Sequence, residues 1–312
     1  MKKIKKKVLV LGGSGMLGSM LTFYLSRNPS LDVSATVKSN QNGKSMQKDV
    51  HWHSLDLDKC SIPTLEKTLN SYDYVINGIG HTKQRITNMS KSTLPYIFWI
   101  NSTFPLLLNE LASRGSFNFV QIGTDCVFNG ELGNYSESSN TDAVDAYGLS
   151  KAITEKKLSN ALVLRNSIVG PEYKNQYSLL EWFLSQPYEA RVLGFTNHFW
   201  NGLSTYHFSK IVEGYIESSD QTKGLIHLVP ADSVSKFQLL CFFQQLFNRN
   251  DLEVQAHEDS DYTNRILRSE FPNQNHKFWV QAGYDEAPTV FEMILESSQI
   301  VDSYRSWVRM VK

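Results

Sequence analysis

The sequence has little cysteine: Cys60, Cys126 and Cys241 are the only three among 312 residues. An odd number of widely spaced cysteines does not form the disulfide framework that holds small secreted domains together. A chain without such a framework is typical of a reducing compartment. We therefore expect the protein to be cytoplasmic.

An excess of charge of either sign is also absent. Lys and Arg together number 31, as do Asp and Glu, so the formal net charge at pH 7 is zero. The composition therefore implies no broad basic face that could follow a nucleic acid. With 41% hydrophobic residues the chain can fill a large core. A globular protein that binds a small molecule is the expectation.

Long apolar runs are missing as well. The first apolar run, Val8–Leu11, follows several lysines and ends at two glycines. So short a run cannot form the core of a signal peptide or a membrane span. The start of the chain therefore predicts a solvated lead into a first strand, and no membrane association is expected.

Short apolar runs alternate with longer amphipathic stretches in the first half of the chain. They predict strands at Val8–Leu11, Val33–Val37, Tyr74–Ile79, Phe117–Ile122 and Ala161–Arg165, and helices at Met16–Leu25, Tyr96–Leu111 and Ala146–Leu158. Such alternation favours a parallel sheet covered by helices. Pro105 predicts either a break in the second helix or a kink near its first turns.

The pattern loosens after about Gly170. Helices are predicted near Tyr177–Leu184, Tyr206–Glu217, Ser233–Phe247 and Val290–Met310, strands at Leu225–Val229 and Glu253–Ala256, and loops at Ser39–Asp49 and Gly130–Asp145. The expected fold class is α/β, with a Rossmann-type doubly wound parallel sheet in residues 1–170. Residues 171–312 would form a smaller C-terminal α/β substrate domain, parts of which can return to the first domain.

A glycine-rich turn joins the first predicted strand to the first predicted helix. Gly12, Gly15 and Gly18 are spaced as G-x-x-G-x-x-G, and Gly13 with the last two also satisfies G-x-G-x-x-G. A tight turn here lets backbone NH groups and the helix N-terminus face a pyrophosphate. We predict that the turn, with Met16 and Leu17, binds a dinucleotide, so residues 1–170 would be an NAD(P)-binding domain.

The end of the second predicted strand indicates which dinucleotide is bound. An acidic residue there would bind the ribose 2′-OH of NAD, but the strand ends in Lys38 and Ser39. A cation and a hydroxyl suit a 2′-phosphate, so NADP(H) is preferred and NAD(H) is the alternative. A solvated loop lysine is the other interpretation of Lys38. Asp56 and Leu57, after a further short run, are expected near the adenine.

A metal site is not expected. His51 and His53 would share one face of a strand. No carboxylate or cysteine is placed to complete a site with them, so a structural role is predicted for both.

The catalytic residues are predicted at the end of one strand and on a following helix. Thr124 follows the strand Phe117–Ile122, and open parallel sheets bind ligands outside the carboxyl ends of their strands. Tyr147 and Lys151 are four residues apart and would share one face of a helix. Asn101 is either a support for Lys151 through a water or a helix-surface amide.

This set of side chains suits carbonyl reduction. A hydride that passes from a nicotinamide to a carbonyl carbon makes an alkoxide, which needs a proton. Tyr147 can supply that proton, and we expect the Lys151 cation to lower the pKa of the phenol. Thr124 can donate a hydrogen bond to the same oxygen.

Taken together, these motifs resemble an extended short-chain dehydrogenase/reductase and, within that group, the dTDP-4-dehydrorhamnose reductase family. The matching segments are Gly12–Gly18, Asn77–Thr82, Asn101, Thr124–Gly130, Tyr147–Lys151 and Leu164–Ser167. The resemblance implies NAD(P)H-dependent reduction of the 4-keto group of a nucleotide-linked 6-deoxyhexose, in bacterial surface-polysaccharide biosynthesis. It implies cofactor contacts by Asn77, Gly78, Asn101, Tyr147 and Lys151, and substrate contacts by His81, Thr82, Asp125, Cys126 and Asn166.

Three positions depart from the family pattern. Gly123 and Cys126 stand where the family usually has Ser and Tyr, and Ile168 stands where a Trp is common. Cys126 is either a reactive thiol or a small apolar residue under the site, and free cysteines favour the second. These departures bear on the identity of the sugar more than on the chemistry.

Aromatic, amide and hydroxyl side chains gather in a predicted loop, Asn197–Thr205. A sugar and nucleobase site needs apolar walls with a few polar groups. His198, Trp200 and Asn201 are therefore predicted to bind substrate. A purely structural loop is the alternative.

Three other functions stay open. Nucleotide-sugar dehydratases of this group typically carry a Glu at the position of Cys126, so dehydration lacks its base. An epimerase would recycle a tightly bound nicotinamide, and a non-catalytic NADP-binding regulatory subunit would not need Thr124, Tyr147 and Lys151 together. The expected partner is a nucleotide-sugar, and a homodimer is left open.

Overall fold

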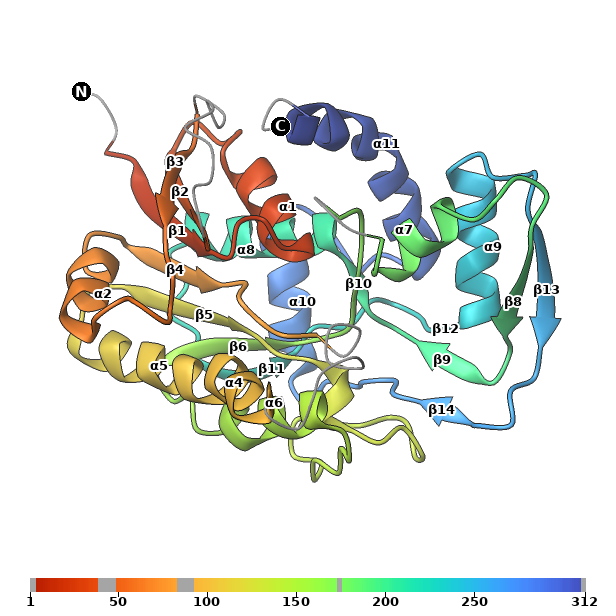
Figure 1. Cartoon of the computed structure of the whole chain (residues 1–312), viewed down its shortest axis with the longest axis horizontal. Helices are drawn as coiled ribbons and strands as arrows, with labels where there is room; N and C mark the ends of the chain where they lie inside the picture. The colour runs from red at the N-terminus through yellow and green to blue at the C-terminus, as the bar shows by residue number, and fades with distance from the viewer. Residues whose placement is uncertain (1–3, 39–48, 83–92, 173–175, 310–312) are drawn as a thin grey trace.

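Seven parallel strands form the central sheet of the protein (Figure 1). The computed structural model describes residues 4–38, 49–82, 93–172 and 176–309. The strands are β1 (Lys6–Leu11), β2 (Leu31–Val37), β3 (His51–Ser54), β4 (Tyr74–Asn77), β5 (Asn118–Ile122), β6 (Ala161–Arg165) and β11 (Gly224–His227). Their spatial order is β11-β6-β5-β4-β1-β2-β3, and each neighbouring pair is parallel. The chain reverses its direction across the sheet between β1 and β4, which makes a doubly wound sheet with a crevice there.

Helices cover both faces of the sheet (Figure 1). One face carries α2 (Ile62–Leu69), α4 (Leu94–Phe98), the π-helical turn η2 (Trp99–Thr103), α5 (Phe104–Arg114) and α6 (Ala146–Glu155), and the other carries α1 (Met16–Leu25), α8 (Thr205–Glu217), α10 (Pro272–Gln281) and α11 (Val290–Arg309). Successive strand residues point to opposite faces. Val8 and Val10 of β1 accordingly join the core on the α1 side, and Leu9 and Leu11 join the core on the α5 side.

A smaller region lies beside the carboxyl ends of the central strands, at the right of Figure 1. It contains β7 (Ile168–Val169), α7 (Leu179–Leu184), β8 (Arg191–Phe195), β9 (His198–Trp200), β10 (Leu203–Ser204), β12 (Val234–Ser235), α9 (Lys236–Leu246), β13 (Glu253–His257) and β14 (Thr263–Asn264). The chain crosses between the two regions more than once. After this region has begun, β11 completes the central sheet and α8 packs against α1.

The predicted α/β fold class is confirmed, and most predicted elements are present. The second predicted helix is broken into α4, η2 and α5, with Pro105 in the first turn of α5, where a missing NH costs no helical hydrogen bond. Helices α2 and α10 were not predicted, because one is short and largely exposed and the other is polar over most of its length. The predicted loop Ser39–Asp49 lies almost wholly outside the described residues.

The loop predicted at Asn197–Thr205 is wrong. The segment forms β9 and β10, and Thr205 begins α8. β9 pairs with β12 on one side and with β14 on the other, and β10 pairs with β7. These pairings join segments far apart in the chain, so the local sequence does not show them.

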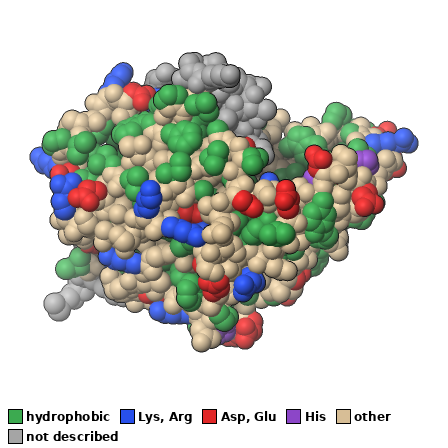
Figure 2. Space-filling model, turned by 90° about the horizontal axis from the view of Figure 1, so that it is seen from below, with side chains coloured by type: hydrophobic (Ala, Val, Ile, Leu, Met, Phe, Trp, Pro, Cys, Tyr) green, Lys and Arg blue, Asp and Glu red, His purple; other side chains and the backbone are tan. Residues whose placement is uncertain are grey.

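The surface carries charges of both signs. On the face seen in Figure 2, Lys and Arg side chains of the described residues are interspersed with Asp and Glu side chains. None of the described helices combines the length and the apolar character that crossing a membrane requires.

Candidate active site

Two adjoining cavities open at the carboxyl ends of the central strands. The first runs along the glycine-rich turn and the ends of β2 and β3, and the second runs along the ends of β5 and β6. Gly15, Met16 and Gly78–Gly80 line both. The cavities therefore meet at the crevice between β1 and β4, where doubly wound sheets bind their ligands.

The glycine-rich turn depends on close backbone packing. A Cβ added to Gly18 would lie 2.2 Å from the carbonyl oxygen of Gly12, and Gly12 itself has a φ of +78°. No side chain caps the N-terminus of α1, where Gly15 is the N-cap residue. Met16 and Leu17 follow on the cavity wall. The first turn of α1 thus has backbone NH groups available for a pyrophosphate, as predicted.

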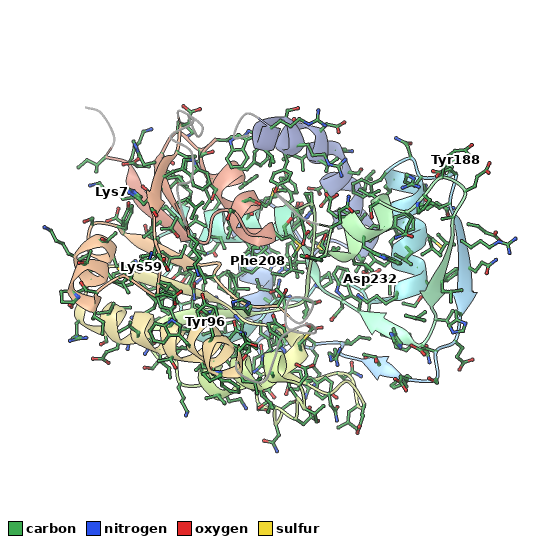
Figure 3. The ribbon with its side chains drawn as sticks, viewed as in Figure 1. Lys7, Lys59, Tyr96, Tyr188, Phe208 and Asp232 are labelled. Atoms are coloured by element: carbon green, nitrogen blue, oxygen red, sulfur yellow. The ribbon has the colours of Figure 1, made fainter. Side chains whose placement is uncertain are left out.

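Lys38 lines the first cavity. Its ammonium pairs with Asp58 at 3.2 Å and donates to the hydroxyl of Tyr96 at 3.3 Å. Tyr96 projects from α4 (Figure 3) and also lines this cavity. The Lys38 side chain is 65% exposed, so its charge is accessible to a ligand phosphate. Ser39 lies outside the described residues.

Of the two residues predicted after β3 to contact the adenine, only one lines a cavity. Leu57 lines the first cavity together with Leu55. Asp56 instead accepts a hydrogen bond from the backbone NH of Asp58 at 3.2 Å and pairs with Lys59 at 3.8 Å. The structure therefore gives Asp56 a role in its own turn, and the adenine contact stays a prediction.

Buried amides hold the loop after β4. Asn77 donates to Gln121 Oε1 at 2.8 Å and accepts from the NH of Ile79 at 3.1 Å. Asn101, only 1% exposed, accepts from the NH of His81 at 2.9 Å and donates to the Oγ of Ser150 at 3.0 Å. The helix-surface alternative for Asn101 is therefore wrong. The Asn101 amide therefore joins the loop after β4 to the helix that carries Lys151.

Helix α6 holds the predicted acid and its neighbouring cation. Asp145 caps the helix by accepting from the NH of Gly148 at 2.8 Å. A Cβ on Gly148 would lie 2.2 Å from the carbonyl oxygen of Cys126, so this glycine lets α6 approach the end of β5 closely. Tyr147 and Lys151 both line the second cavity. The Lys151 ammonium donates to the carbonyl of Ile122 at 3.2 Å.

Thr124 lines the same cavity from the segment after β5. Its hydroxyl caps the short 3-10 turn η3 (Asp125–Val127) by accepting from the NH of Cys126 at 3.2 Å. It also forms a hydrogen bond with the phenol of Tyr147. Thr124, Tyr147 and Lys151 therefore all line the second cavity, which agrees with their predicted grouping.

The predicted lowering of the Tyr147 pKa is wrong for this structure. Burial raises the pKa of the phenol, and the hydrogen bond from Thr124 opposes that rise only in part. The Lys151 ammonium is aimed at the carbonyl of Ile122, and burial lowers its own pKa to about 8. Tyr147 is thus held in its neutral form, which is the form that can donate a proton.

Cys126 lies beside these groups on the cavity wall. Burial raises the pKa of its thiol to about 12, with the Asp125 carboxylate as the next cause. A thiol in this state carries almost no thiolate at neutral pH. The geometry therefore favours the unreactive alternative for Cys126.

Asn166 has a buried amide that faces the second cavity. The residue is 2% exposed, and neither amide atom has a hydrogen-bond partner among the described residues. A buried amide without partners is costly in a folded protein. A polar ligand group in the cavity would satisfy it, which supports the predicted substrate contact.

The structure brings only some of the remaining predicted substrate residues to the second cavity. Thr82 and Asp125 line the second cavity, as does the buried Trp200, whereas His81 lines the first. Asn201 donates to the carbonyl of Leu267 at 2.7 Å and accepts from its NH at 3.0 Å. His198 contacts the carbonyl of Asp261 at 2.7 Å. These backbone partners argue against substrate contacts by Asn201 and His198, which stay predictions.

Two cations of the second cavity were not predicted. The Lys236 ammonium lies 5.5 Å from the centroid of the Trp200 ring, and burial lowers the pKa of Lys236 to about 8. Arg265 donates to the carbonyls of Phe128 and Asn129 at 2.8 and 3.0 Å. One sequence signal could have marked Lys236: it is the first residue of α9, where the helix dipole disfavours a cation. Arg265 has no such local signal.

Histidine and carboxylate side chains do not gather into a metal site in the described part of the chain. No group of three or more His, Cys, Asp or Glu residues there could hold a metal ion. His51 pairs with Asp32 at 3.5 Å, and His53 contacts the hydroxyl of Tyr72 at 3.1 Å. Both histidines thus have structural partners.

Three features define an NAD(P)-dependent oxidoreductase of the extended short-chain dehydrogenase/reductase group. They are the sheet, the glycine-rich turn, and the side chains of Thr124, Tyr147 and Lys151 in the second cavity. The chain belongs to the RmlD substrate binding domain family, which matches residues 6–294. The family predicted from the motifs is thereby confirmed. No curated protein matches the sequence.

Solved structures with the same fold span nearly the whole chain. The dTDP-4-dehydrorhamnose reductase of Clostridium acetobutylicum is 18% identical, with a TM-score of 0.69 over 95% of this chain and 99% of that one. The Bacillus anthracis reductase, in complex with NADP, is 17% identical, with a TM-score of 0.70 over 94% and 98%. The UDP-glucuronic acid 4-epimerase of Bacillus cereus, in complex with NAD, is 13% identical, with a TM-score of 0.68 over 95% and 96%. At such low identities the likeness concerns the fold.

Proposed function

We propose that the protein is an NADPH-dependent reductase of the 4-keto group of a nucleotide-linked 6-deoxyhexose, in bacterial surface-polysaccharide biosynthesis. One observation carries the proposal. Thr124, Tyr147 and Lys151 line a cavity that shares Gly15, Met16 and Gly78–Gly80 with the cavity along the glycine-rich turn. A dinucleotide bound along the turn would therefore place its nicotinamide end beside the phenol.

The side chains then divide the chemistry among them. Bound NADPH supplies a hydride to the carbonyl carbon of the substrate. Tyr147, partly buried and neutral, gives its proton to the oxygen as negative charge develops there. Thr124 donates a hydrogen bond to the same oxygen, and the charge of Lys151 stabilises the phenolate that Tyr147 becomes.

The rest of the second cavity suits a nucleotide-linked sugar. A diphosphate carries negative charge, and Lys236 and Arg265 supply two cations to the cavity wall. The amide of Asn166 offers a donor and an acceptor for hydroxyl or phosphate groups. Trp200 provides an apolar wall.

Cys126 favours reduction over dehydration. A dehydratase needs a base at this position to move a ring proton, whereas the pKa of the Cys126 thiol is raised to about 12. An epimerase stays the second candidate, because the Bacillus cereus UDP-glucuronic acid 4-epimerase shares the fold.

Net consumption of NADPH tests the proposal. The protein is incubated with NADPH and a panel of nucleotide-linked 4-keto-6-deoxysugars, while the absorbance of the reduced nicotinamide is followed. One NADPH consumed for each sugar reduced is the expected result. Turnover of a sugar without net loss of NADPH would instead identify an epimerase, and no turnover of any sugar would favour a binding subunit.

Lys38 should decide the cofactor preference. We expect Lys38→Met to weaken NADPH binding about tenfold, because a charge-assisted hydrogen bond to the 2′-phosphate contributes roughly 1.5 kcal/mol. The affinity for NADH, which lacks that phosphate, should stay the same. Fluorescence titration with both cofactors measures this. Lys59→Met is the matched control, since the Lys59 side chain is 83% exposed and directly follows Asp58, the ion-pair partner of Lys38. Equal losses of affinity for NADPH and NADH in Lys38→Met would contradict the role of Lys38.

Three further features belong to the proposal. The three cysteines are free, which fits a cytoplasmic enzyme. The division at about residue 170 into a cofactor domain and a substrate domain is retained, with β11 returned to the first domain. Whether two copies associate is left to a measurement of the mass in solution.

A further inference from the structure

Helix α6 carries a third ionisable group on the face that holds Tyr147 and Lys151. Glu155 follows Lys151 by four residues, so the two side chains are neighbours on the helix. Lys151 is 8% exposed and Glu155 is 5% exposed. A buried carboxylate thus lies one helical turn beyond the buried ammonium.

Arg165 holds this carboxylate in place. The fully buried guanidinium at the end of β6 donates from Nε to Glu155 Oε2 at 3.2 Å and from Nη2 to Glu155 Oε1. Burial raises the pKa of the Glu155 carboxyl, and the forked pair with Arg165 opposes that rise and fixes the orientation of the carboxylate. A Cβ on Gly123 would lie 2.9 Å from the Cα of Arg165, so the glycine in place of the usual serine lets β6 approach.

His227 fixes the other side of the guanidinium. Nη1 of Arg165 and Nε2 of His227 are 2.7 Å apart, and because a guanidinium can only donate, Nε2 must accept. The proton is then on Nδ1, which donates to the carbonyl of Arg268 at 2.9 Å. His227 is therefore neutral, and burial lowers its pKa to about 4. Glu155 is the carboxylate that pairs with Arg165, and its charge raises the pKa of Lys151.

The charge of Lys151 needs such a neighbour. An ammonium removed from water is costly unless an opposite charge lies close, and its hydrogen bond to Ile122 is to a neutral carbonyl. The charged and titratable groups around it are Tyr147 and Glu155 from α6, Asp125 and Cys126 from η3, Arg165 from β6, and Glu172, Lys236 and Arg265 across the cavity. Burial lowers the pKa of Lys151, and Glu155 is the group that raises it.

We propose that Glu155 is a positioning residue that keeps the buried Lys151 ammonium charged beside Tyr147, with Arg165 and His227 holding the Glu155 carboxylate in place. The catalytic use of that charge rests on the proposed reduction. A simpler alternative is that Glu155 and Arg165 only join α6 to β6. The two roles differ in what they do to the titration of Lys151.

The test follows the Lys151 amine directly. Protein carrying isotope-labelled lysine is titrated by NMR, and the Lys151 signal is assigned by its loss in Lys151→Arg. The midpoint is expected near pH 8 in the parent and about one pH unit lower or more in Glu155→Gln. Glu155→Asp keeps the charge and should restore most of the difference. Glu137→Gln removes another buried carboxylate, beyond His227, and should leave the midpoint nearly unchanged.

The folded state is checked by thermal unfolding. If Glu155→Gln alone does not fold, Glu155→Gln combined with Arg165→Met leaves no unpaired charge from this pair, and a downward shift of the Lys151 midpoint is still expected, smaller because the Arg165 cation is removed as well. An unchanged Lys151 midpoint in the folded variant would overturn the proposal and leave only the joining role.

Turnover separates this proposal from the proposed function. On the alkaline side, kcat/KM for the 4-keto sugar should begin to fall at a lower pH in Glu155→Gln than in the parent, together with the lower midpoint of Lys151. If the midpoint moves while the parent reduces no sugar, the reductase proposal fails and the role of Glu155 stands. If the parent is active and neither the midpoint nor the alkaline fall in kcat/KM moves, the role of Glu155 fails and the reductase stands.

Discussion

Replacing Tyr147 with Phe is expected to lower kcat for reduction of the 4-keto sugar about a thousandfold. In the proposed reaction the phenol hydroxyl carries the proton to the developing alkoxide, and general acids contribute roughly a hundredfold to ten-thousandfold. Water would have to deliver the proton in its place. NADPH affinity should change by less than about twofold, because the ring that packs in the site is retained.

Stopped-flow and steady-state measurements of NADPH oxidation check this result. Tyr188→Phe is the control, since Tyr188 is 77% exposed and lies in the region far from the central sheet (Figure 3). That variant should keep the parent rate. A Tyr147→Phe enzyme within tenfold of the parent would exclude Tyr147 as the acid and would strengthen the regulatory-subunit alternative.

Replacing Gly18 with Ala is expected to have the largest effect on cofactor binding and stability. The new methyl carbon would lie 2.2 Å from the Gly12 carbonyl oxygen and 2.9 Å from its carbon, both of them backbone atoms that no rotamer change can move. α1 would have to move away from β1, at a cost of about 3 kcal/mol. NADPH affinity should fall at least a hundredfold, because the NH groups at the start of α1 leave the pyrophosphate.

Gly15→Ala supplies the matched comparison. Its added Cβ would have the Gly12 carbonyl oxygen as its nearest neighbour, at 3.4 Å, which is an ordinary contact. Thermal unfolding should therefore show a loss within about 1 kcal/mol for this variant, as for an N-cap substitution. Equal unfolding temperatures for the two variants would show that close packing at Gly18 is not what holds the turn.

Much of the candidate site could be predicted because its parts are local. The glycine-rich turn follows directly from a strand and precedes a helix, and the four-residue spacing of Tyr147 and Lys151 already implies one helical face. Thr124 could be placed because it follows a strand, and strand ends meet at one edge of a parallel sheet. Periodicity and chain neighbours were sufficient for these residues.

Other parts depend on contacts between distant segments. Lys236 and Arg265 reach the second cavity from elements more than eighty residues beyond Tyr147. The segment after Asn197 looked like a loop, but β12 and β14 make it a strand. His198 and Asn201 looked like ligand contacts, but the backbone of Asp261 and Leu267 takes their hydrogen bonds. Pairing over such separations leaves no periodic signal.

The sequence by itself determined the α/β class, the glycine-rich turn and the set of Thr124, Tyr147 and Lys151. Each depends on residues close together in the chain, and helix and strand periodicity decides which of these share a face. Only the tertiary structure decided the protonation states. Burial keeps the Tyr147 phenol neutral against the expected lowering of its pKa, and Arg165 forces His227 into its neutral form. Desolvation and buried charge pairs exist only once distant segments have packed together, so residue types alone do not contain them.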